Sequence, residues 1–210
     1  MKTNIIAISG KIGAGKDTLA YYIPQIYMQH RLHNDYTKHV SFYRKSFADK
    51  LKQIVQLLSG YNMTKDEHNL FFSNERYNYS QEDKNVYIES YGMTIGEMLQ
   101  KLGTDAIRKH FHSDTWVNAV FVDDIRENDL WIITDCRFKN EADAVKKNGG
   151  KIIRIEGDPA GVRANSKRDL NHQSEIDLDD YTGFDLIIQN DGTEEDLINK
   201  IKTELFPLIF

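Results

Sequence analysis

The sequence has a single cysteine, Cys136, among its 210 residues. A lone cysteine excludes an intramolecular disulfide and a cysteine metal cluster, so a reducing compartment suits the chain. No apolar run approaches the roughly 18 residues that a membrane-spanning helix needs. The chain runs from Lys2 directly into a short strand and a glycine-rich loop, which leaves no room for a signal peptide. We therefore expect a cytoplasmic protein that has no membrane partner.

An excess of positive charge is also lacking. Lys and Arg number 27 against 32 Asp and Glu, which gives a formal net charge of -5. Broad binding to nucleic-acid polymers or to anionic membrane surfaces requires a surplus of Lys and Arg. We therefore expect no polymeric nucleic-acid partner, and any anionic ligand must meet a local cluster of basic side chains.

Short runs rich in Ile, Val and aromatic residues predict β-strands, and helical patterns fill the gaps between them. The strands are expected at Asn4–Ser9, His39–Tyr43, Leu130–Thr134, Lys151–Glu156 and Phe184–Gln189. This alternation predicts parallel strands joined by right-handed crossovers, with helices on both faces of the sheet. The fold class is therefore α/β, and the length predicts that residues 1–210 form one domain.

Capping signals mark the starts of two helices. Thr193 with Asp196 resembles a capping box and opens the last helical pattern of the chain. Thr94 with Glu97 opens another helix, which we expect to break near Gly103.

Some features interrupt the regular pattern. Pro24 lies inside the first helical pattern, where its missing N–H and its ring predict a bend or an end of the helix. Residues 60–92 are polar and rich in tyrosine, which indicates an insertion or a cover. Residues 157–180 are similarly irregular but carry several basic side chains, as is typical of a lid.

The stretch Gly10-Lys11-Ile12-Gly13-Ala14-Gly15-Lys16-Asp17-Thr18 follows the first strand and precedes a helical pattern. Its G-x-x-x-x-G-K spacing is that of a phosphate-binding loop, in which backbone N–H groups converge on phosphate oxygens and the lysine neutralises the β- and γ-phosphates. The positive end of the helix dipole points at the same anion. We therefore expect ATP to contact Gly10, Lys11, Gly13, Ala14, Gly15, Lys16 and Thr18.

Asp17 stands where such loops normally carry a serine or threonine that ligates Mg²⁺, so the hydroxyl is shifted by one residue to Thr18. A carboxylate could hold the hydration shell of Mg²⁺ or pair with a basic group on the phosphate acceptor side. A solvent-facing aspartate that is stabilised by the helix dipole is the third interpretation.

Trp131–Asp135 reads as an apolar strand that ends in a carboxylate, an arrangement that resembles a Walker B strand. Asp135 is therefore a candidate Mg²⁺ ligand, direct or through water, and the alternative is a surface aspartate that caps the next helix. Arg137 lies at the end of the same strand, where its guanidinium could hold two phosphate oxygens.

Several segments, taken in order, resemble the phage-type deoxynucleoside monophosphate kinases. They are Gly13–Thr18, Ser46–Lys52, Leu99–Asp105 with Arg108, Trp116-Val117, Asp135–Ala142, Gly149-Gly150, His172–Glu175 and Asn190–Thr193. The resemblance implies a P-loop NTPase-like three-layer fold with a mostly parallel central sheet, an inserted substrate-binding segment at about 60–92 and a lid at about 157–180. It also implies ATP and Mg²⁺ as cofactors.

The resemblance assigns roles to further residues. Lys16, Asp17 and Arg137 are the expected catalytic residues, and Asp17, Thr18 and Asp135 the expected metal contacts. Acceptor contacts are expected from Asp49, Lys50, Arg108, Trp116, Arg137 and Glu175, ATP contacts also from Asn190 and Gly192, and lid contacts from Arg163, Arg168 and His172. The family often carries an arginine near the position of Gly96, which is absent here, and Arg76 or Arg108 could substitute.

The function that the resemblance implies is transfer of the γ-phosphoryl group of ATP to a deoxynucleoside 5′-monophosphate. The partners are then small nucleotides, the location is the cytoplasm of a host if the chain is viral, and a homodimer is left open. The alternatives are a P-loop kinase of another phosphorylated metabolite, of the phosphomevalonate or dephospho-coenzyme A type, and a non-catalytic nucleotide-binding regulator.

Overall fold

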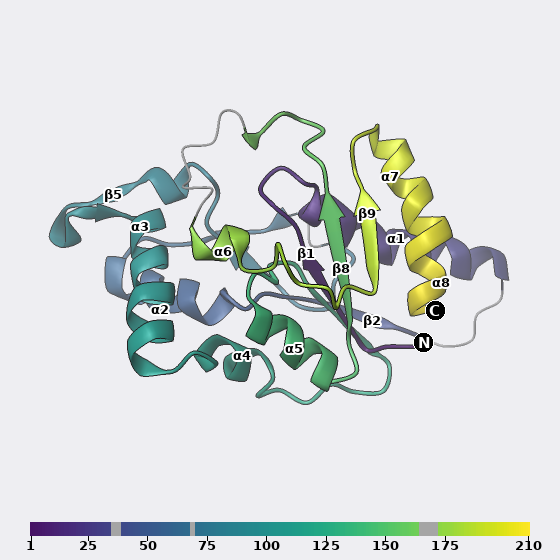
Figure 1. Ribbon diagram of the computed structural model, residues 1–210, viewed down its shortest axis with the longest axis horizontal. Helices are drawn as coiled ribbons and strands as arrows, with labels where there is room; N and C mark the ends of the chain where they lie inside the picture. The colour runs from purple at the N-terminus through teal and green to yellow at the C-terminus, as the bar shows by residue number, and fades with distance from the viewer. Residues whose placement is uncertain (35–38, 68–69, 164–171) are drawn as a thin grey trace.

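The computed structural model describes residues 1–34, 39–67, 70–163 and 172–210. Within this part of the chain, five parallel strands form the central sheet in the order β2-β7-β1-β8-β9 (Figure 1). These strands are β1 (Ile5–Ser9), β2 (Ser41–Lys45), β7 (Asp129–Ile133), β8 (Lys151–Glu156) and β9 (Leu186–Gln189). The expected strands and their parallel arrangement are confirmed.

Hydrophobic side chains cover both faces of the sheet and make a three-layer fold. Along β1, Ile6 and Ile8 point to one face and Ile5 and Ala7 to the other. The first face packs against α1 (Lys16–Asn34), α7 (Glu194–Lys200), the π-helical segment Ile201–Leu205 and α8 (Phe206–Ile209). The second packs against α2 (Asp49–Ser59), α3 (Ile95–Gln100), α4 (Thr115–Val120) and α5 (Lys139–Lys147).

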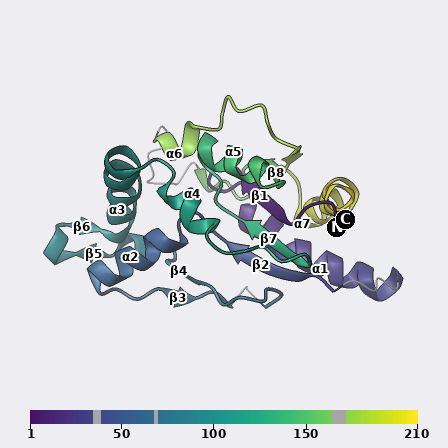
Figure 2. The ribbon, with the colours of Figure 1, turned by 90° about the horizontal axis from the view of Figure 1, so that it is seen from below.

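The two ends of the chain lie side by side (Figures 1 and 2). The backbone N–H of Lys2 donates to the carbonyl of Ile209 over 2.6 Å. No helix in the described ranges has both the length and the apolar character to cross a membrane.

The helix that begins after Thr94 has its predicted capping box, because Thr94 and Glu97 satisfy each other's backbone N–H groups. The expected break near Gly103 is wrong. The chain continues as a π-helix over Lys101–Phe111. Gly103 instead allows α2 to approach closely, since a Cβ at this position would lie 2.6 Å from Cδ2 of Leu51.

The first helix does not end at Pro24 either. It continues to Asn34, with Ile23, Ile26 and Tyr27 buried in the core around the proline. Burial of this apolar face outweighs the hydrogen bond that the proline cannot donate. The second predicted capping box, between Thr193 and Asp196, is present at the start of α7.

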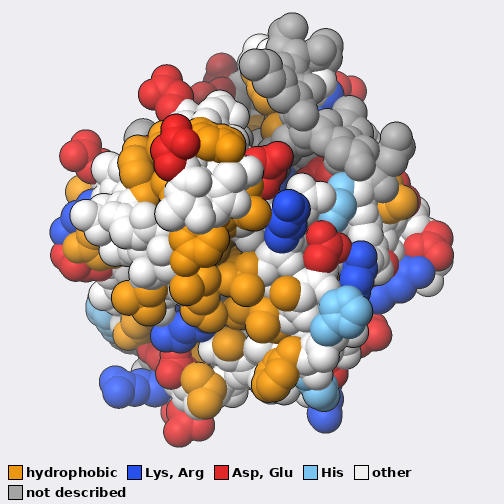
Figure 3. Space-filling model, turned by 90° about the vertical axis from the view of Figure 1, so that its left-hand side faces the viewer, with side chains coloured by type: hydrophobic (Ala, Val, Ile, Leu, Met, Phe, Trp, Pro, Cys, Tyr) orange, Lys and Arg blue, Asp and Glu red, His pale blue; other side chains and the backbone are white. Residues whose placement is uncertain are grey.

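The described residues of 60–92 form short elements beside α2 and α3 (Figure 2). Strand β3 (Thr64–Lys65) pairs antiparallel with β4 (Tyr77–Asn78), and β5 (Tyr87–Ile88) with β6 (Met93–Thr94), with 3₁₀ turns at Asp83–Asn85 and Glu89–Tyr91. Hydrophobic side chains gather on this face of the molecule (Figure 3), where the exposed residues of α2 include Ile54, Leu57 and Leu58. The buried Tyr79 anchors the segment through a 3.0 Å bond from its hydroxyl to the carbonyl of Tyr61.

Candidate active site

The glycine loop joins the carboxyl end of β1 to the first turn of α1. Gly13 and Gly15 have φ of +79° and +95°, a region that residues with a side chain rarely adopt. The ammonium of Lys16 donates to the carbonyls of Gly10 at 2.7 Å and Lys11 at 2.8 Å, so it lies over the loop. This arrangement fits a triphosphate, whose oxygens could replace those carbonyls as hydrogen-bond acceptors of the lysine ammonium.

Residues distant in the sequence hold the loop in this shape. The buried side chain of Asn190 donates to the carbonyl of Ala14 over 2.9 Å, and a Cβ at Gly15 would lie 2.5 Å from the same amide nitrogen. Arg163 donates through Nε to the carbonyl of Ile12 over 3.1 Å. Both residues predicted from the sequence to approach ATP therefore contact the glycine loop itself.

The side chain of Lys11 points away from the loop toward a carboxylate. Its ammonium lies 2.6 Å from Asp179, whose other oxygen lies 3.2 Å from the guanidinium of Arg154. Arg154 in turn donates to the hydroxyl of Ser9 at the end of β1 over 3.1 Å. The predicted contact of Lys11 with ATP is thus left to its backbone in this conformation.

Asp135 follows the carboxyl end of β7, next to β1, and receives a set of hydrogen bonds. Its oxygens accept from the hydroxyl of Ser46 at 2.5 Å and from the backbone N–H groups of Phe47 at 2.8 Å and Ala48 at 3.1 Å. These bonds fix the turn that opens α2. Asp49, the first residue of α2, accepts from the N–H of Ser46 at 2.9 Å, and burial raises the pKa of its carboxyl. Lys50 lies on the exposed side of the helix.

Buried basic side chains lie beside this turn. The side chain of Arg44, in β2, is 3% exposed and that of Arg76 is 8% exposed. Their guanidinium groups share Asp66, at 3.4 and 3.2 Å. Among the described residues, the Nε atoms of Arg44 and Arg76 are buried without a hydrogen-bond partner. Lys52, whose pKa is lowered by burial, lies 3.5 Å from Asp49 and completes the cluster.

Arg44 was not singled out by the sequence patterns, although a signal was present. In β2, Phe42 and Arg44 occupy the buried positions of an alternating pattern. A charged residue at a buried strand position is rare unless it is paired, so it indicates a functional or structural ion pair. The sequence indicates Arg76 only as a substitute for the missing arginine near Gly96.

Asp17 is directed at this cluster. Its carboxylate forms an ion pair with the guanidinium of Arg44, although 76% of the Asp17 side chain is exposed. Protein atoms around the carboxylate oppose ionisation, but the positive charge of Arg44, aided by other basic groups nearby, holds the pKa of Asp17 below its ordinary 3.8. The residue after the loop lysine is therefore negatively charged and forms an ion pair with an arginine.

Arg137 and Glu175, both predicted to contact substrate, are brought together. The guanidinium of Arg137 pairs with Glu175 and donates to the carbonyl of Ser174 over 3.3 Å. Glu175 belongs to the short helix α6 (Gln173–Ile176), which His172 caps by accepting the N–H of Ser174 at 3.2 Å. The predicted lid residue Arg168 lies outside the described residues.

Arg108 and Trp116 make contacts within the protein. The guanidinium of Arg108 pairs with the buried Glu141 and lies 4.0 Å from the centre of the Phe138 ring. Burial raises the pKa of Glu141 to about 7. The charge of Arg108 and the hydrogen bonds that the carboxylate accepts from the backbone N–H groups of Arg137 and Phe138 oppose this rise. Trp116 donates from Nε1 to the carbonyl of Gly103 at 3.0 Å.

The predicted metal contacts do not converge into a closed cage. Among the residues that the structure describes, no three His, Cys, Asp or Glu side chains come together as a metal site. Mg²⁺ that arrives with ATP needs one or two protein oxygens, with phosphates and water as its other ligands. Thr18 and Asp135 are the predicted residues with oxygens of this kind, and Asp135 accepts hydrogen bonds from Ser46, Phe47 and Ala48 in this structure.

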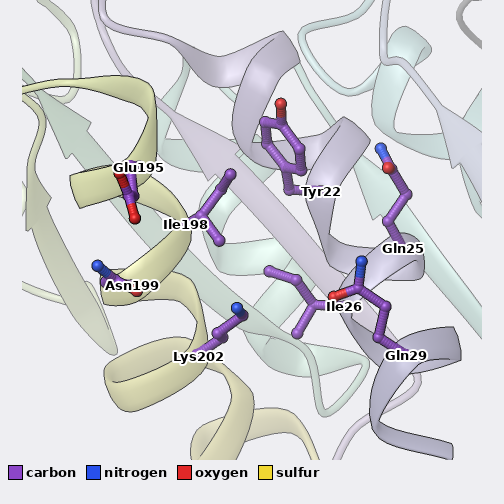
Figure 4. Close-up of a pocket in the computed structure, with 8 residues that line it drawn as sticks. All are labelled: Tyr22, Gln25, Ile26, Gln29, Glu195, Ile198, Asn199 and Lys202. Carbon is purple, nitrogen blue, oxygen red and sulfur yellow. The ribbon is translucent and has the colours of Figure 1, made fainter. Parts of the chain in front are cut away.

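A cavity of about 290 Å³ lies elsewhere, between α1 and the C-terminal helices (Figure 4). Its lining is mostly polar and includes Gln25, Gln29, Asn199 and Lys202. None of the residues predicted for nucleotide binding lines it, so the glycine loop and the basic cluster define the candidate site.

The sheet order, the loop after β1 and the carboxylate after β7 define a P-loop kinase fold. A model of the deoxynucleotide monophosphate kinase family matches residues 35–201, and the chain belongs to this family. The phage-type resemblance of the sequence is confirmed.

Two viral relatives carry the name of the same family. The chain is 27% identical to a protein of Acanthamoeba polyphaga mimivirus, provisionally named deoxynucleotide monophosphate kinase, over 94% of this chain and 93% of that one. It is 33% identical to the deoxynucleotide monophosphate kinase of Enterobacteria phage T4 over 53% of this chain and 45% of the phage protein. Among solved structures, shikimate kinase from Aquifex aeolicus aligns over 97% of both chains at 14% identity, with a TM-score of 0.44.

Proposed function

We propose that the protein transfers the γ-phosphoryl group of ATP to the 5′-phosphate of a deoxynucleoside monophosphate, giving a deoxynucleoside diphosphate and ADP. One observation carries the proposal further than the family match does. Asp17 joins the lysine of the phosphate loop to a buried arginine pair whose Nε–H groups have no acceptor among the described residues. A phosphate monoester on the acceptor supplies such acceptors beside the place where the γ-phosphate would lie.

The reaction brings two anions together, so the work of the protein is positioning and charge neutralisation, and no general base is required. We assign the donor phosphates to the glycine loop and Lys16, and the acceptor phosphate to Arg44 and Arg76. Arg137, held by Glu175, is assigned to the phosphoryl group in transfer.

Mg²⁺ bound with ATP would neutralise the β- and γ-phosphates, and Thr18 and Asp135 are the residues that would hold it, directly or through water. The lid predicted at 157–180, with Arg163, Arg168 and His172, would exclude water as a competing acceptor. We also propose acceptor-side roles for Asp49, Lys50, Arg108 and Trp116, as the sequence predicts.

The relatives of this chain come from viruses, which supports a reaction in the cytoplasm of an infected cell. A kinase of phosphomevalonate or dephospho-coenzyme A would use the same core and differs in its acceptor. A nucleotide-binding regulator would have no need of arginines prepared for a second phosphate.

A coupled assay of ADP release tests the proposal. ATP and Mg²⁺ are supplied with each common NMP and dNMP, and separately with phosphomevalonate, dephospho-coenzyme A or no acceptor. We expect at least one dNMP to stimulate ADP formation. Failure of every nucleoside monophosphate would contradict the proposed activity, whereas equal hydrolysis without any acceptor would favour a regulator.

The variant Lys16→Ala tests the donor site. Loss of the ammonium is expected to lower turnover by about 100-fold or more, because it neutralises charge on the transferred group. The thermal unfolding of Lys16→Ala should match that of the wild type. The control Lys147→Ala removes an exposed lysine from the end of α5 and should match the wild type in both turnover and thermal unfolding. Near-normal turnover of Lys16→Ala would overturn the assignment of the glycine loop.

A further inference from the structure

We infer that Asp17 is a positioning residue for the acceptor phosphate, acting through Arg44, and that it is not a ligand of the metal. The inference rests on the proposed function and decides among the interpretations that the sequence leaves open for this residue.

The direction of the side chain is the first reason. Asp17 follows the loop lysine at the start of α1, yet its carboxylate pairs with a residue of β2. In the sheet, β7 separates β2 from β1, the strand that leads into the glycine loop. The ion pair therefore joins two elements that are not neighbours in the sheet and links the donor loop to the buried cluster.

The partners of Arg44 are the second reason. Arg44 lies between Asp17 and Asp66, and Asp66 also pairs with Arg76. Without the carboxylate of Asp17, the guanidinium of Arg44 would be drawn toward Asp66 and away from the loop. Arg44 Nε is buried without a hydrogen-bond partner in the described part of the chain, and this shift would move it away from the side of the cluster that meets Asp17.

The third reason is the energetic cost of the alternative role, in which Asp17 coordinates Mg²⁺. A buried guanidinium that loses one partner of a charge-assisted bond is strongly disfavoured. The pair with Arg44 uses Oδ1 of Asp17, so a Mg²⁺ ion at that oxygen would compete with the guanidinium. Thr18 and Asp135 make no ion pair with an arginine among the described residues, so we assign the metal to them and the pairing with Arg44 to Asp17.

The consequence is that the position of the acceptor-binding arginine depends on the position of the donor loop. The backbone that places Lys16 on the γ-phosphate also places the carboxylate that aims Arg44 at the acceptor. Displacing a reactant by about 1 Å costs on the order of 100-fold in rate, so a rigid link between donor and acceptor sites serves an in-line transfer.

Asp17→Asn tests the inference, since it keeps the size of the side chain and removes the charge. Rates are measured against dNMP, ATP and Mg²⁺ concentrations, and the Kd of the dNMP is measured by calorimetry without ATP or Mg²⁺. We expect the KM and the Kd of the dNMP to rise about tenfold or more, as for the loss of one charge-assisted bond. The KM of ATP and the half-saturating Mg²⁺ concentration should stay within about twofold of the wild-type values.

Controls separate positioning from general damage. Asp124→Asn removes an exposed carboxylate from the turn before β7 and should match the wild type in every measurement. Asp17→Glu keeps the charge and should recover part of the dNMP affinity. In an Arg44→Lys background, Asp17→Asn should add less than its separate effect, because both changes remove the same contact.

The outcomes are distinct. An Asp17→Asn protein that binds dNMP normally but needs more Mg²⁺ makes Asp17 a metal ligand and overturns the inference. Unchanged dNMP affinity with unchanged Mg²⁺ dependence overturns it as well. A wild-type protein that neither binds nor phosphorylates any dNMP removes the proposed function, and the inference with it.

Discussion

Individual carboxylates carry much of the organisation of this protein. Asp135 fixes the turn before α2, Asp17 holds Arg44, and Asp185 joins β9 to its neighbours. Asp185 accepts from Lys146 at 2.5 Å, from the N–H of Ile152 at 2.8 Å and from Lys151 at 3.2 Å. Burial opposes its ionisation, but these donors hold the pKa of Asp185 below its ordinary 3.8.

Asp185→Asn is expected to lower the free energy of unfolding at pH 7 by about 1–2 kcal/mol. Because the folded pKa is depressed, the contribution of Asp185 is present above the unfolded value of 3.8 and is lost as the pH falls through the folded value. Urea denaturation of the wild type and variant between pH 3 and 8 measures this. The difference should be constant from pH 5 to 8 and shrink below pH 4, and a difference that grows on acidification would contradict the assignment.

At the scale of the residue, the sequence predicts candidate site residues where they lie together in one continuous segment. The glycine loop and the carboxylate of Asp135 could be placed because each lies directly after an apolar strand. The pairing of Asp17 with Arg44 could not be found in this way, since it depends on the strand order that places β2 beside β7. The pairing of Arg108 with Glu141, which lie far from each other in the sequence, could not be found in this way either.

Among the elements, the C-terminal part of the predicted lid, residues 172–180, is held in place by its acidic residues. Glu175 pairs with Arg137, Asp177 accepts the N–H of Lys139 at 2.8 Å, and Asp179 pairs with Lys11 and Arg154. These contacts join residues 172–180 to the glycine loop and to the ends of β7 and β8.

Asp179→Asn is expected to loosen this segment without unfolding the protein. Loss of the charge releases Lys11 in the loop and one contact of the buried Arg154. Hydrogen exchange read by mass spectrometry should show faster exchange in residues 172–180, with a small change in Tm. Asp180→Asn, which removes an exposed pair with Lys139, should leave exchange unchanged. Unaltered exchange in Asp179→Asn would show that other contacts fix the segment.

Predictions of elements succeeded where the signal is local. The strands follow from apolar runs, and the capping boxes at Thr94 and Thr193 follow from side chains three residues apart. The predicted break at Gly103 was wrong, and α1 continues past Pro24, for one shared reason. Tertiary packing against Leu51 in one case, and burial of the face around Ile23 in the other, overrides the local preference.

For the molecule as a whole, the parallel sheet places the groups proposed for the donor and the acceptor at one edge. The glycine loop follows β1, Asp135 follows β7, and Arg44 lies near the carboxyl end of β2, on neighbouring strands. Ligands of open α/β sheets bind outside this edge. The fold class could be predicted from the sequence because the alternation of strands and helices is global, whereas the strand order and the packing of residues 60–92 beside α2 and α3 came from the structure.

The most direct test of the account is a crystal structure with a non-hydrolysable ATP analogue, Mg²⁺ and an accepted dNMP. We expect the triphosphate to lie within Gly10–Thr18 and in contact with Lys16, and the acceptor phosphate to accept hydrogen bonds from Arg44 and Arg76. A triphosphate bound elsewhere with the loop empty, or an acceptor phosphate distant from both arginines, would contradict the account.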